Sequence, residues 1–273
     1  MIRNRGKSSR IGVAHLNDRV WMSRTPILIW AALAIMVFAR TASSQGLGTV
    51  ETSMPAPTTA QIIEQMQRHD QRQATSLQSY EGQRHYSVTY RGFTRTITAN
   101  MDVEMTYDAS SGKSFRIISQ KGSRMLCDKV LKRAVDSERE ASLDKSSTAL
   151  NSVNYKFLLI GMDRVDDRPA YVLTVEPISP SKFLYKGQIW VDATEFAVAK
   201  MEVQPAKNPS FWISRTLIHH TNRITNGFWL PEQNQSETKV RVGGTATMCI
   251  DYQSYRIAAK ADSSTTPPAA GTR

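Results

Sequence analysis

Residues 93–108 carry the longest alternating pattern in the chain, and this pattern constrains the fold more than any other feature. One set of alternate residues is apolar apart from Arg95: Phe93, Ile97, Ala99, Met101, Val103, Met105 and Tyr107. The residues between them are all Thr, Asn, Asp or Glu. Because successive side chains of a strand point to opposite faces, the segment predicts a long, half-buried antiparallel strand.

Further strands are expected along the rest of the chain, with the sheet beginning near Arg84. Their predicted ranges are 113–120, 153–164, 169–177, 185–192, 196–204, 211–225, 228–242 and 245–257. The strand 196–204 is expected to place Ala197, Ala199, Met201 and Val203 on one face. Asp166-Asp167, Asn226-Gly227 and Gly243-Gly244 are typical of the turns between strands.

Two helices are predicted beside these strands. Thr58 and Gln61 form a capping-box pattern, and Ile62, Ile63, Met66 and Leu77 mark one apolar side of a helix over 59–78. Val130, Leu131, Ala134 and Val135 have helical spacing and predict a second helix over 128–142. Two helices cannot cover both faces of some ten long strands, so the sheet must close or curve around its own apolar face.

A curved sheet with helices in or over its concavity forms a cup that suits an apolar ligand such as an acyl chain. The alternative is a cup filled by its own side chains, and the sequence leaves both open. The candidate cavity-lining residues are Phe93, Ile97, Ala99, Met101, Val103, Met105, Trp190 and Met201. For Trp190, Trp212 and Trp229, each beside other apolar residues, a place in the core is favoured over cavity lining.

The N-terminal region has the pattern of a secretory leader. Residues 26–39 form one apolar run between Arg24 and Arg40, shorter than the ~20 residues of a membrane span and typical of a signal peptide. Small residues precede Gln45, which predicts cleavage after Ser44, a signal peptide over 1–44 and a periplasmic product. An uncleaved inner-membrane anchor is the alternative. Met22 opens a conventional leader, so residues 1–21 are a candidate for an incorrectly assigned start.

The remaining residues divide into a linker over 45–58, a curved-sheet domain over 59–257 and a disordered tail over 258–273. Without residues 1–44 the chain has 28 basic and 23 acidic residues, a net charge of +5. It lacks a basic run interleaved with aromatic residues, so nucleic-acid binding is not expected. Cys127 and Cys249 are compatible with one disulfide or with two free thiols.

Motifs for catalysis are not found. His219 and His220 are adjacent on a strand, point to opposite faces and cannot both ligate one metal. His69 and His85 stand alone, and Asp192 and Asp251 have the position of turn-forming strand-end residues. The chain has no Gly-x-Ser-x-Gly elbow, phosphate-binding loop or Cys-x-x-Cys pair. We therefore expect no catalytic, cofactor or metal site, and a protein that is not an enzyme.

Several short segments carry a resemblance to a known group: 130–133 (VLKR), 154–157 (NYKF), 183–187 (FLYKG), 189–192 (IWVD), 205–212 (PAKNPSFW), 228–231 (FWLP) and 250–252 (IDY). Over residues 79–256 the chain resembles bacterial outer-membrane lipoprotein-sorting proteins of the LolA/LolB-like carrier superfamily. The resemblance implies an incomplete, strongly curved antiparallel β-barrel, mainly β (α+β), with a helical lid over an apolar cavity. No ligand residue is carried over, because no position matches the carriers' lid-binding arginine by motif.

Two functions follow as hypotheses. The first is a periplasmic carrier that holds the acyl chains of lipoproteins or other lipids and makes transient membrane contact. The second is a non-transporting envelope interaction or signalling module on the same fold, whose sheet presents a surface to a protein partner.

Overall fold

The structure, a computed structural model, describes residues 56–143, 145–208, 210–241 and 243–259. The expected signal peptide, most of the expected linker and residues 260–273 of the expected tail lie outside this range. No helix in the described part of the chain is long and apolar enough to cross a membrane.

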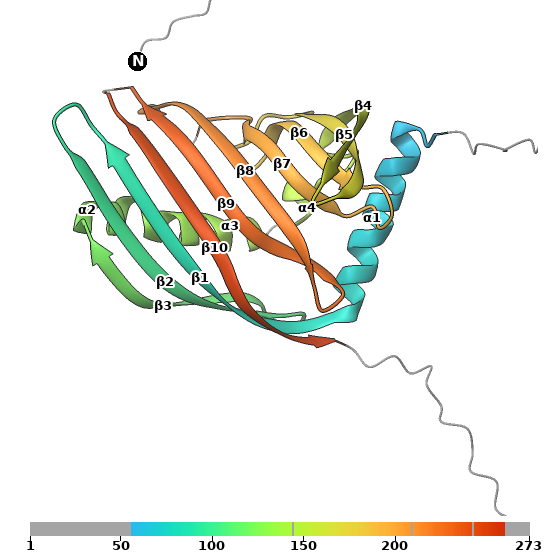
Figure 1. Cartoon of the computed structure of the whole chain (residues 1–273), viewed down its shortest axis with the longest axis horizontal. Helices are drawn as coiled ribbons and strands as arrows, with labels where there is room; N and C mark the ends of the chain where they lie inside the picture. The colour runs from blue at the N-terminus through green and yellow to red at the C-terminus, as the bar shows by residue number, and fades with distance from the viewer. Residues whose placement is uncertain (1–55, 144, 209, 242, 260–273) are drawn as a thin grey trace, which may run out of the picture. The chain divides into compact units, whose positions relative to one another are not determined.

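The described residues form one antiparallel sheet of ten strands in the order β3-β2-β1-β10-β9-β8-β7-β6-β5-β4. The sheet is open, with β3 and β4 at its edges, and it curves strongly around a helix (Figure 1). The strands are β1 (Leu77–Arg91), β2 (Thr96–Asp108), β3 (Gly112–Gly122), β4 (Tyr155–Val165), β5 (Arg168–Pro177), β6 (Tyr185–Asp192), β7 (Val198–Pro205), β8 (Ile213–Thr225), β9 (Phe228–Val240) and β10 (Thr245–Ala259). The expectation of a strongly curved, incomplete antiparallel barrel with a helix over it is confirmed.

Helix α1 (Thr59–Ser76) precedes the sheet and leads directly into β1. Its predicted capping box is present: Gln61 N–H donates to Thr58 Oγ1 at 3.3 Å, and Thr58 N–H donates to Gln61 Oε1 at 2.8 Å. These two bonds satisfy backbone donors that a helix start leaves without an intrahelical partner.

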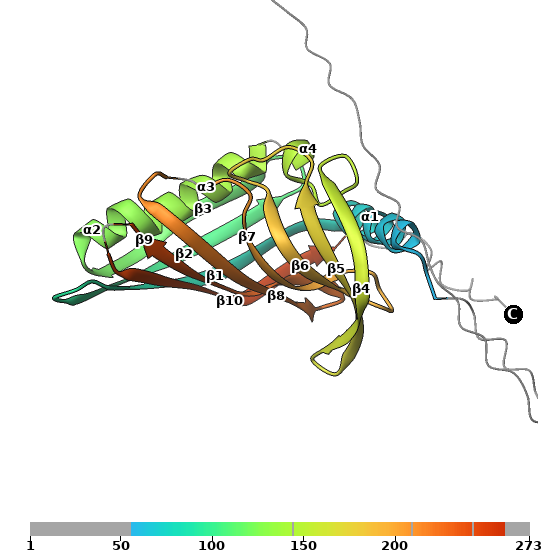
Figure 2. The ribbon, with the colours of Figure 1, turned by 90° about the horizontal axis from the view of Figure 1, so that it is seen from above.

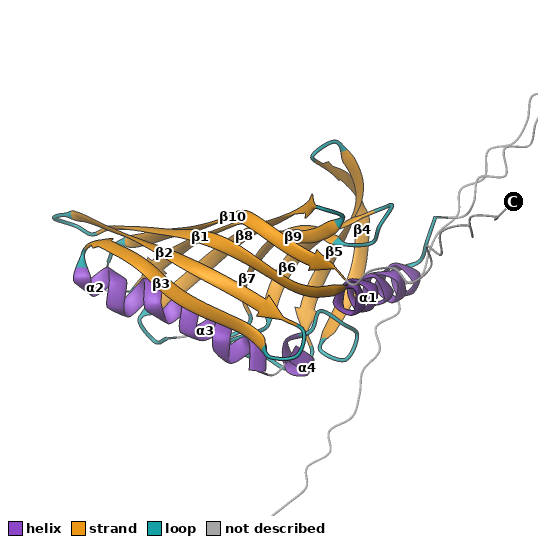
Figure 3. Cartoon of the chain, turned by 90° about the horizontal axis from the view of Figure 1, so that it is seen from below, coloured by secondary structure: helices purple, strands orange, loops and turns teal. Residues whose placement is uncertain are grey.

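The second helical stretch follows β3 and has three contiguous parts: α2 (Arg124–Leu126), the π-helical segment η1 (Cys127–Leu131) and α3 (Lys132–Leu143). The short helix α4 (Lys145–Thr148) comes before β4. In Figures 2 and 3, α2, α3 and α4 lie along one face of the sheet and α1 lies at the end near β4.

Each long helix covers its own half of the sheet and forms its own core. The α1 core joins Ile62, Ile63 and Met66 of the helix to buried residues mainly of β4 to β7: Tyr155, Leu173, Val175, Leu184, Ile189, Val191 and Val203. The α3 core joins Leu126, Cys127, Leu131 and Val135 to residues of β1, β2 and β10: Tyr86, Val88, Ala99, Met101, Val103, Ile250 and Tyr252. Burial of apolar side chains on both halves therefore fixes where the helices lie.

Two predicted strand starts differ from the observed ones by more than two residues. The sheet begins at Leu77 and not near Arg84, because the helix ends at Ser76 and Leu77 already pairs with Ala259 of β10. The strand predicted from residue 93 begins at Thr96, because Gly92 N–H donates to Arg95 O at 3.0 Å and closes a turn there. Pairing with β1 also keeps β10 ordered to Ala259, two residues into the expected tail.

The expectation that Ala197, Ala199, Met201 and Val203 share one face is also wrong. The pairing of β6 with β7 shifts register between Trp190–Lys200 and Val191–Val198, which leaves Ala199 as an extra residue. Such a bulge reverses the alternation of side chains along a strand. Met201 and Val203 accordingly belong to the α1 core, whereas Ala197 and Ala199 pack with Trp229 elsewhere.

Candidate functional site

A cavity of about 510 Å³ lies between α3 and the inner face of the sheet, and we name it the α3 cavity. Its helix wall consists of Ala134, Ser137, Glu138 and Ala141. Its sheet wall consists of Ile213, Thr216 and Ile218 of β8, Asn234, Ser236 and Thr238 of β9, and Met248, Ile250 and Tyr252 of β10. Thr148, Lys182, Phe183, Tyr185 and Pro205 complete it.

Small side chains on α3 explain the empty space. Ala134, Ser137 and Ala141 follow one another at spacings of three and four, so they lie on one side of the helix. Larger residues at these positions would fill the gap, as Leu126 and Leu131 do in the preceding turns. The small side chains in the second half of α3 therefore leave the space between this helix and the sheet unfilled.

The sheet wall combines two kinds of surface. Ile213, Ile218, Met248 and Ile250 are apolar, whereas β9 contributes the amide of Asn234 and the hydroxyls of Ser236 and Thr238. The hydroxyls of Thr216 and Thr238 lie 3.0 Å apart and share a hydrogen bond. An elongated molecule with an apolar chain and a polar group would find partners for both here.

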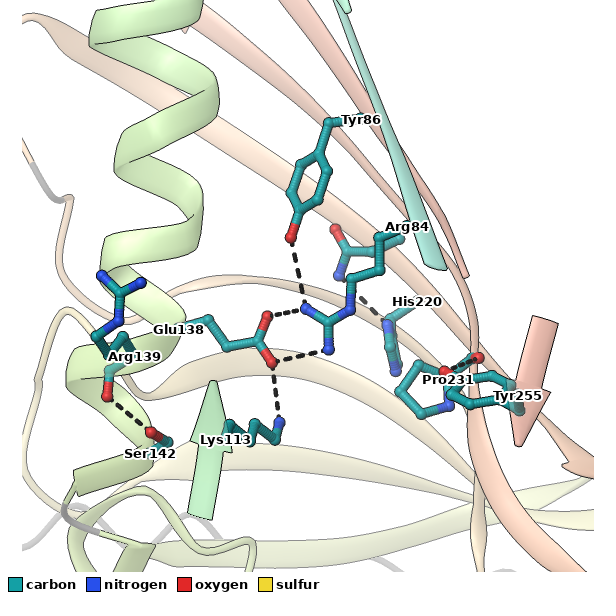
Figure 4. A network of polar contacts seen from close by, with 10 residues as sticks. Arg84, Tyr86, Lys113, Glu138, Arg139, Ser142, His220, Pro231 and Tyr255 are labelled. Atoms are coloured by element: carbon teal, nitrogen blue, oxygen red, sulfur yellow. Dashed lines mark hydrogen bonds and ion pairs between the residues drawn. The ribbon is translucent and has the colours of Figure 1, made fainter. Parts of the chain in front are cut away.

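An ion-pair network around the buried Arg84 joins α3 to the sheet beside the cavity (Figure 4). Arg84 of β1 donates from Nη1 to Glu138 Oε2 at 2.5 Å and from Nη2 to Glu138 Oε1 at 3.2 Å. Lys113 of β3 donates to Glu138 Oε1 at 2.9 Å. The Arg84 guanidinium also lies over the Tyr252 ring, 4.7 Å from its centroid. One carboxylate of α3 thus connects two strands.

The charges of this network determine the ionisation of Glu138. Burial alone would raise its pKa, but the charges of Lys113 and Arg84 and their hydrogen bonds outweigh burial and lower the pKa to about 2. Burial likewise disfavours the charged form of Arg84, yet Glu138 raises the pKa of Arg84 above its ordinary value. Glu138 is therefore a carboxylate throughout the physiological range.

The two adjacent histidines lie on opposite faces of β8, as predicted. His220 is on the inner side: Asn234 Nδ2 donates to its Nδ1 at 3.3 Å, and its Nε2 lies 3.0 Å from Asn222 Oδ1. Burial lowers the pKa of His220, which favours the neutral ring. His219 is exposed and lies 3.8 Å from Glu202 Oε1. Among the described residues, no group of three His, Cys, Asp or Glu could hold a metal ion.

None of the eight predicted lining residues belongs to the lining of the α3 cavity. Ile97, Ala99, Met101 and Val103 pack in or against the α3 core, Met105 packs with Leu77 and Tyr80, and Met201 packs against the α1 core. The predicted positions of Phe93 and Trp190 on the inner face of the sheet are wrong. Phe93 is 89% exposed in the turn before β2, and Trp190 lies on the face opposite its neighbours Ile189 and Val191.

The tryptophans and aspartates singled out in the sequence have structural surroundings. Trp190 is buried with Ala170 and Val172 and donates to Asp163 at 3.0 Å, and Trp229 is buried with Ala197 and Ala199. The predicted core place of Trp212, within a strand over 211–225, is wrong: Trp212 is 59% exposed in the loop before β8, which begins at Ile213. Asp192 accepts from the N–H of Glu195 at 2.7 Å and binds Arg168, as expected of a turn-forming residue. Asp251 is not at a strand end, because it lies within β10 and accepts from Gln233 at 2.8 Å. Both cysteines are free.

The sequence indicated an isolated His85. In the structure, His85 is instead paired on the outer face of the sheet. Its Nδ1 lies 2.7 Å from Asp102 Oδ1, and Ser119 Oγ donates to Asp102 Oδ2 at 2.5 Å. The hydrogen bond from Ser119, followed by that of His85, lowers the pKa of Asp102. Because the serine hydroxyl binds the carboxylate and not the imidazole, this group lacks the serine–histidine contact that activates a nucleophile.

Sequence reasoning missed the residues that make this site: Arg84, Glu138 and the polar inner residues of β9. A signal for Arg84 exists, because Tyr80, Gly82, Tyr86 and Val88 alternate with it on the buried face of β1. A charged residue at such a position requires a buried partner. For Asn234, Ser236 and Thr238 no such signal is present, because residues 232–239 are polar on both faces of the strand.

Comparisons with known proteins concern the fold. No protein-family model and no curated protein matches the chain. Similar solved structures include a DUF1329 family protein from Desulfovibrio piger ATCC 29098, with 14% identity, 74% of this chain and 94% of that chain covered, and a TM-score of 0.38. Another is a LolA superfamily protein from Nitrosomonas europaea, with 13% identity, 74% and 94% covered, and a TM-score of 0.33.

A third is an outer membrane lipoprotein-sorting protein domain from Vibrio parahaemolyticus, with 9% identity, 76% and 94% covered, and a TM-score of 0.37. The second and third of these structures bear the names of the LolA superfamily and of the outer membrane lipoprotein-sorting proteins.

Proposed function

We propose that this chain is a binding or carrier protein for lipoproteins or other acylated lipids, and that the α3 cavity holds an acyl chain. The observation that carries the proposal is the cavity of about 510 Å³ between α3 and β8 to β10. Its volume is within the range of ligand pockets, about 300–1,000 Å³.

The distribution of polar groups supports an amphipathic ligand. Apolar side chains such as Ile218 and Met248 suit hydrocarbon, and the Ser236 and Thr238 hydroxyls can hydrogen-bond an ester or amide of a lipid head. A purely hydrocarbon ligand would leave these polar groups without partners on the ligand. A lipid whose linkage region lies near β9 and whose chain extends toward Met248 uses both kinds of surface.

The proposal also assigns a role to α3. Its helix wall is joined to the sheet by Glu138, which lines the cavity and binds Arg84 and Lys113. A ligand larger than the cavity would have to displace α3 and separate this ion pair. The strength of this ion pair would then set the free energy of moving α3 away from the sheet. Glu138 would separate from Arg84 when the cavity opens and bind it again when the cavity closes.

Export completes the proposal. A carrier in the periplasm requires removal of the leader, and the apolar run 26–39 with small residues before Gln45 supports cleavage after Ser44. N-terminal sequencing of the cell-associated protein with membrane fractionation tests this step. A full-length chain that resists a carbonate wash would favour the anchored alternative.

Binding is tested with a fluorescent fatty acid and with mass spectrometry of lipid extracted from protein purified as the cell produces it. Ala141→Trp should fill the cavity from the helix side and weaken probe binding by at least tenfold. Arg133→Trp is the matched control, because the same group is added to an exposed position of the same helix. Ala99, 1% exposed within the α3 core, is unsuitable because a larger residue there would disrupt packing.

Two outcomes would contradict the proposal. The first is a folded wild-type protein that neither binds the probe nor carries extractable lipid, and this result would favour the interaction or signalling module. The second is equal weakening by Ala141→Trp and Arg133→Trp, which would place probe binding outside the α3 cavity.

A further inference from the structure

Three loops meet at one end of the sheet, and we name this surface the loop rim. It consists of the β1–β2 turn (Gly92–Arg95), the β9–β10 hairpin (241 and 243–244) and the β7–β8 loop (206–208 and 210–212). The hairpin tips of β1–β2 and β9–β10 lie side by side in Figure 1. None of these segments forms part of the lining of the α3 cavity.

Direct contacts hold the rim together. Tyr90 Oη donates to Gly243 O at 2.8 Å, and the Phe93 ring lies so close to Gly243 that a Cβ there would be 1.9 Å from it. Arg241 N–H donates to Trp212 O at 2.8 Å, and the Arg241 guanidinium lies 5.0 Å from the centroid of the Phe211 ring. The three loops therefore present one surface.

Large apolar side chains of the rim are exposed to solvent. Phe93 is 89% exposed, Phe211 74% and Trp212 59%. The rings of Phe211 and Trp212 contact each other edge to face, with centroids 5.6 Å apart. Exposed aromatic groups gathered on one surface indicate an interaction site and not ordinary surface variation.

The charge of the rim has one sign. Arg91, Arg95, Lys207, Arg215 and Arg241 are exposed on or beside its loops. Residues 91–97, 205–215 and 239–247 contain no Asp or Glu, and the nearest acidic residue before Arg241 is Glu237. The complementary surface is therefore anionic.

We propose that the loop rim docks on the surface of an anionic lipid bilayer. Phe93, Phe211 and Trp212 enter the headgroup boundary, where aromatic side chains are favourable, while the neighbouring arginines face lipid phosphates. The proposal goes beyond the proposed function, because it concerns a different surface and holds whether or not the α3 cavity binds acyl chains.

A bilayer fits the rim better than a protein does. A second copy of this chain would bring two sets of five basic residues together and repel. A protein interface typically seats its aromatic anchors in well-packed pockets. Phe93 at 89% exposure is instead a projecting tip, which suits insertion into a soft surface.

The test is flotation with vesicles of phosphatidylglycerol and phosphatidylcholine, using protein purified as the cell produces it. Wild-type protein should bind the phosphatidylglycerol-containing vesicles, less so as salt rises. Arg91→Gln, Arg95→Gln and Arg241→Gln together should weaken binding about a hundredfold, from the usual contribution of a basic residue near an anionic surface. Phe93→Ser, Phe211→Ser and Trp212→Ser together should reduce it at least tenfold.

A matched control is available on the edge strand β4. Leu158, Ile160 and Met162 are 62%, 48% and 62% exposed, and their combined change to Ser removes a similar number of exposed apolar groups from another surface. This variant should bind vesicles as the wild type does, and all variants should keep the wild-type melting temperature within a few degrees. Comparison in one background cancels any contribution of the leader.

Three results would overturn the proposal: no wild-type binding to either vesicle, equal losses in the rim and β4 variants, or equal binding to charged and neutral vesicles. If the wild type binds no vesicles but captures an acidic protein, and the rim variants lose that capture, the surface would be assigned to a protein partner instead.

Discussion

The two long helices are attached to the same sheet by different means. Helix α1 is held by Ile62, Ile63 and Met66, which are nearly or completely buried in the α1 core. At its C-terminal end, Gln73 exchanges two hydrogen bonds of 3.0 Å with the backbone of Trp229. Helix α3 contributes Val135 to its buried core, and beyond that point Glu138 connects it to Arg84 and Lys113, with the Arg139 guanidinium 5.6 Å from the centroid of the Phe115 ring.

This difference separates a fixed element from one that can move. The stabilisation from apolar burial is roughly proportional to the area buried, so detaching α1 would expose its whole apolar side, and α1 should remain attached whenever the domain is folded. An ion pair can be opened locally if water or a ligand takes the place of one partner. The second half of α3, above the cavity, should therefore open at lower free energy than α1. Three predictions test this contrast.

The largest effect is expected for Ile62→Ala. Ile62 is completely buried, so the substitution leaves a cavity in the α1 core and should lower the free energy of unfolding by about 4 kcal/mol. Chemical denaturation measures this, with Ile160→Ala on the exposed part of β4 as control, for which less than about 0.5 kcal/mol is expected. Equal losses for both variants would remove the argument that α1 is fixed by burial.

A smaller loss, about 3 kcal/mol, is expected for Glu138→Gln, because Arg84 would remain buried without a charged partner. Glu140→Gln is the matched control: Glu140 binds Lys182 at an exposed position on the same helix, and such pairs contribute at most about 1 kcal/mol. The double change Arg84→Met with Glu138→Leu should restore most of the stability. Hydrogen exchange should rise in α3 and not in α1; a uniform rise would contradict separate attachment.

The smallest effect is expected from acid. Because the folded pKa of Glu138 is about 2 against an ordinary 4.5, its stabilisation is complete above pH 4.5 and is lost as pH falls toward 2. The shift corresponds to about 3 kcal/mol, and to about 2 after allowance for solvent screening of its exposed part. Titration of stability in the wild type and in Glu138→Gln isolates this contribution, since only the wild type should show it.

His220 adds a loss of stability at higher pH than the loss from Glu138. The same titration must distinguish the two losses. Burial lowers its pKa, so below its ordinary value of 6.5 the unfolded state takes up the proton first and stability falls. Glu138→Gln should keep this part of the pH profile. A profile that is flat between pH 7 and 5 would show that His220 does not remain neutral in the folded protein.

Local features were predictable from sequence, and features that depend on distant partners were not. The capping box at Thr58 and the Asp166-Asp167 and Asn226-Gly227 turns depend on neighbouring residues, and the structure contains all three, with positive φ at each turn residue. The bulge at Ala199 depends on how β7 pairs with β6, so alternation alone wrongly placed Met201 on the same face as Ala197 and Ala199.

The candidate site was harder to predict for the same reason. The face of β2 that carries Ala99, Met101 and Val103 was correctly expected to be buried, but it packs against α2, η1 and the start of α3 and does not line the cavity. The empty space lies farther along the sheet, where small residues of α3 face polar residues of β9. The position of this cavity depends on the direction in which α3 crosses the strands. That direction is not encoded in any single segment of the sequence.

The π-helical segment η1 adds a constraint on rotation. Lys132 N–H donates to Cys127 O, five residues back, so this turn contains one residue more than an α-helical turn. Each residue of a helix rotates the following side chains by about 100°. Deleting Lys129 would therefore let the wide turn close to an α-helical one, with Val135 still on its core and Glu138 still beside Arg84. Deleting a residue of α3 between Lys132 and Glu138, where no turn holds an extra residue, would instead turn Glu138 by about 100° away from Arg84. The wide turn thus lets the chain hold one more residue between Leu126 and Glu138 while Val135 and Glu138 keep their directions.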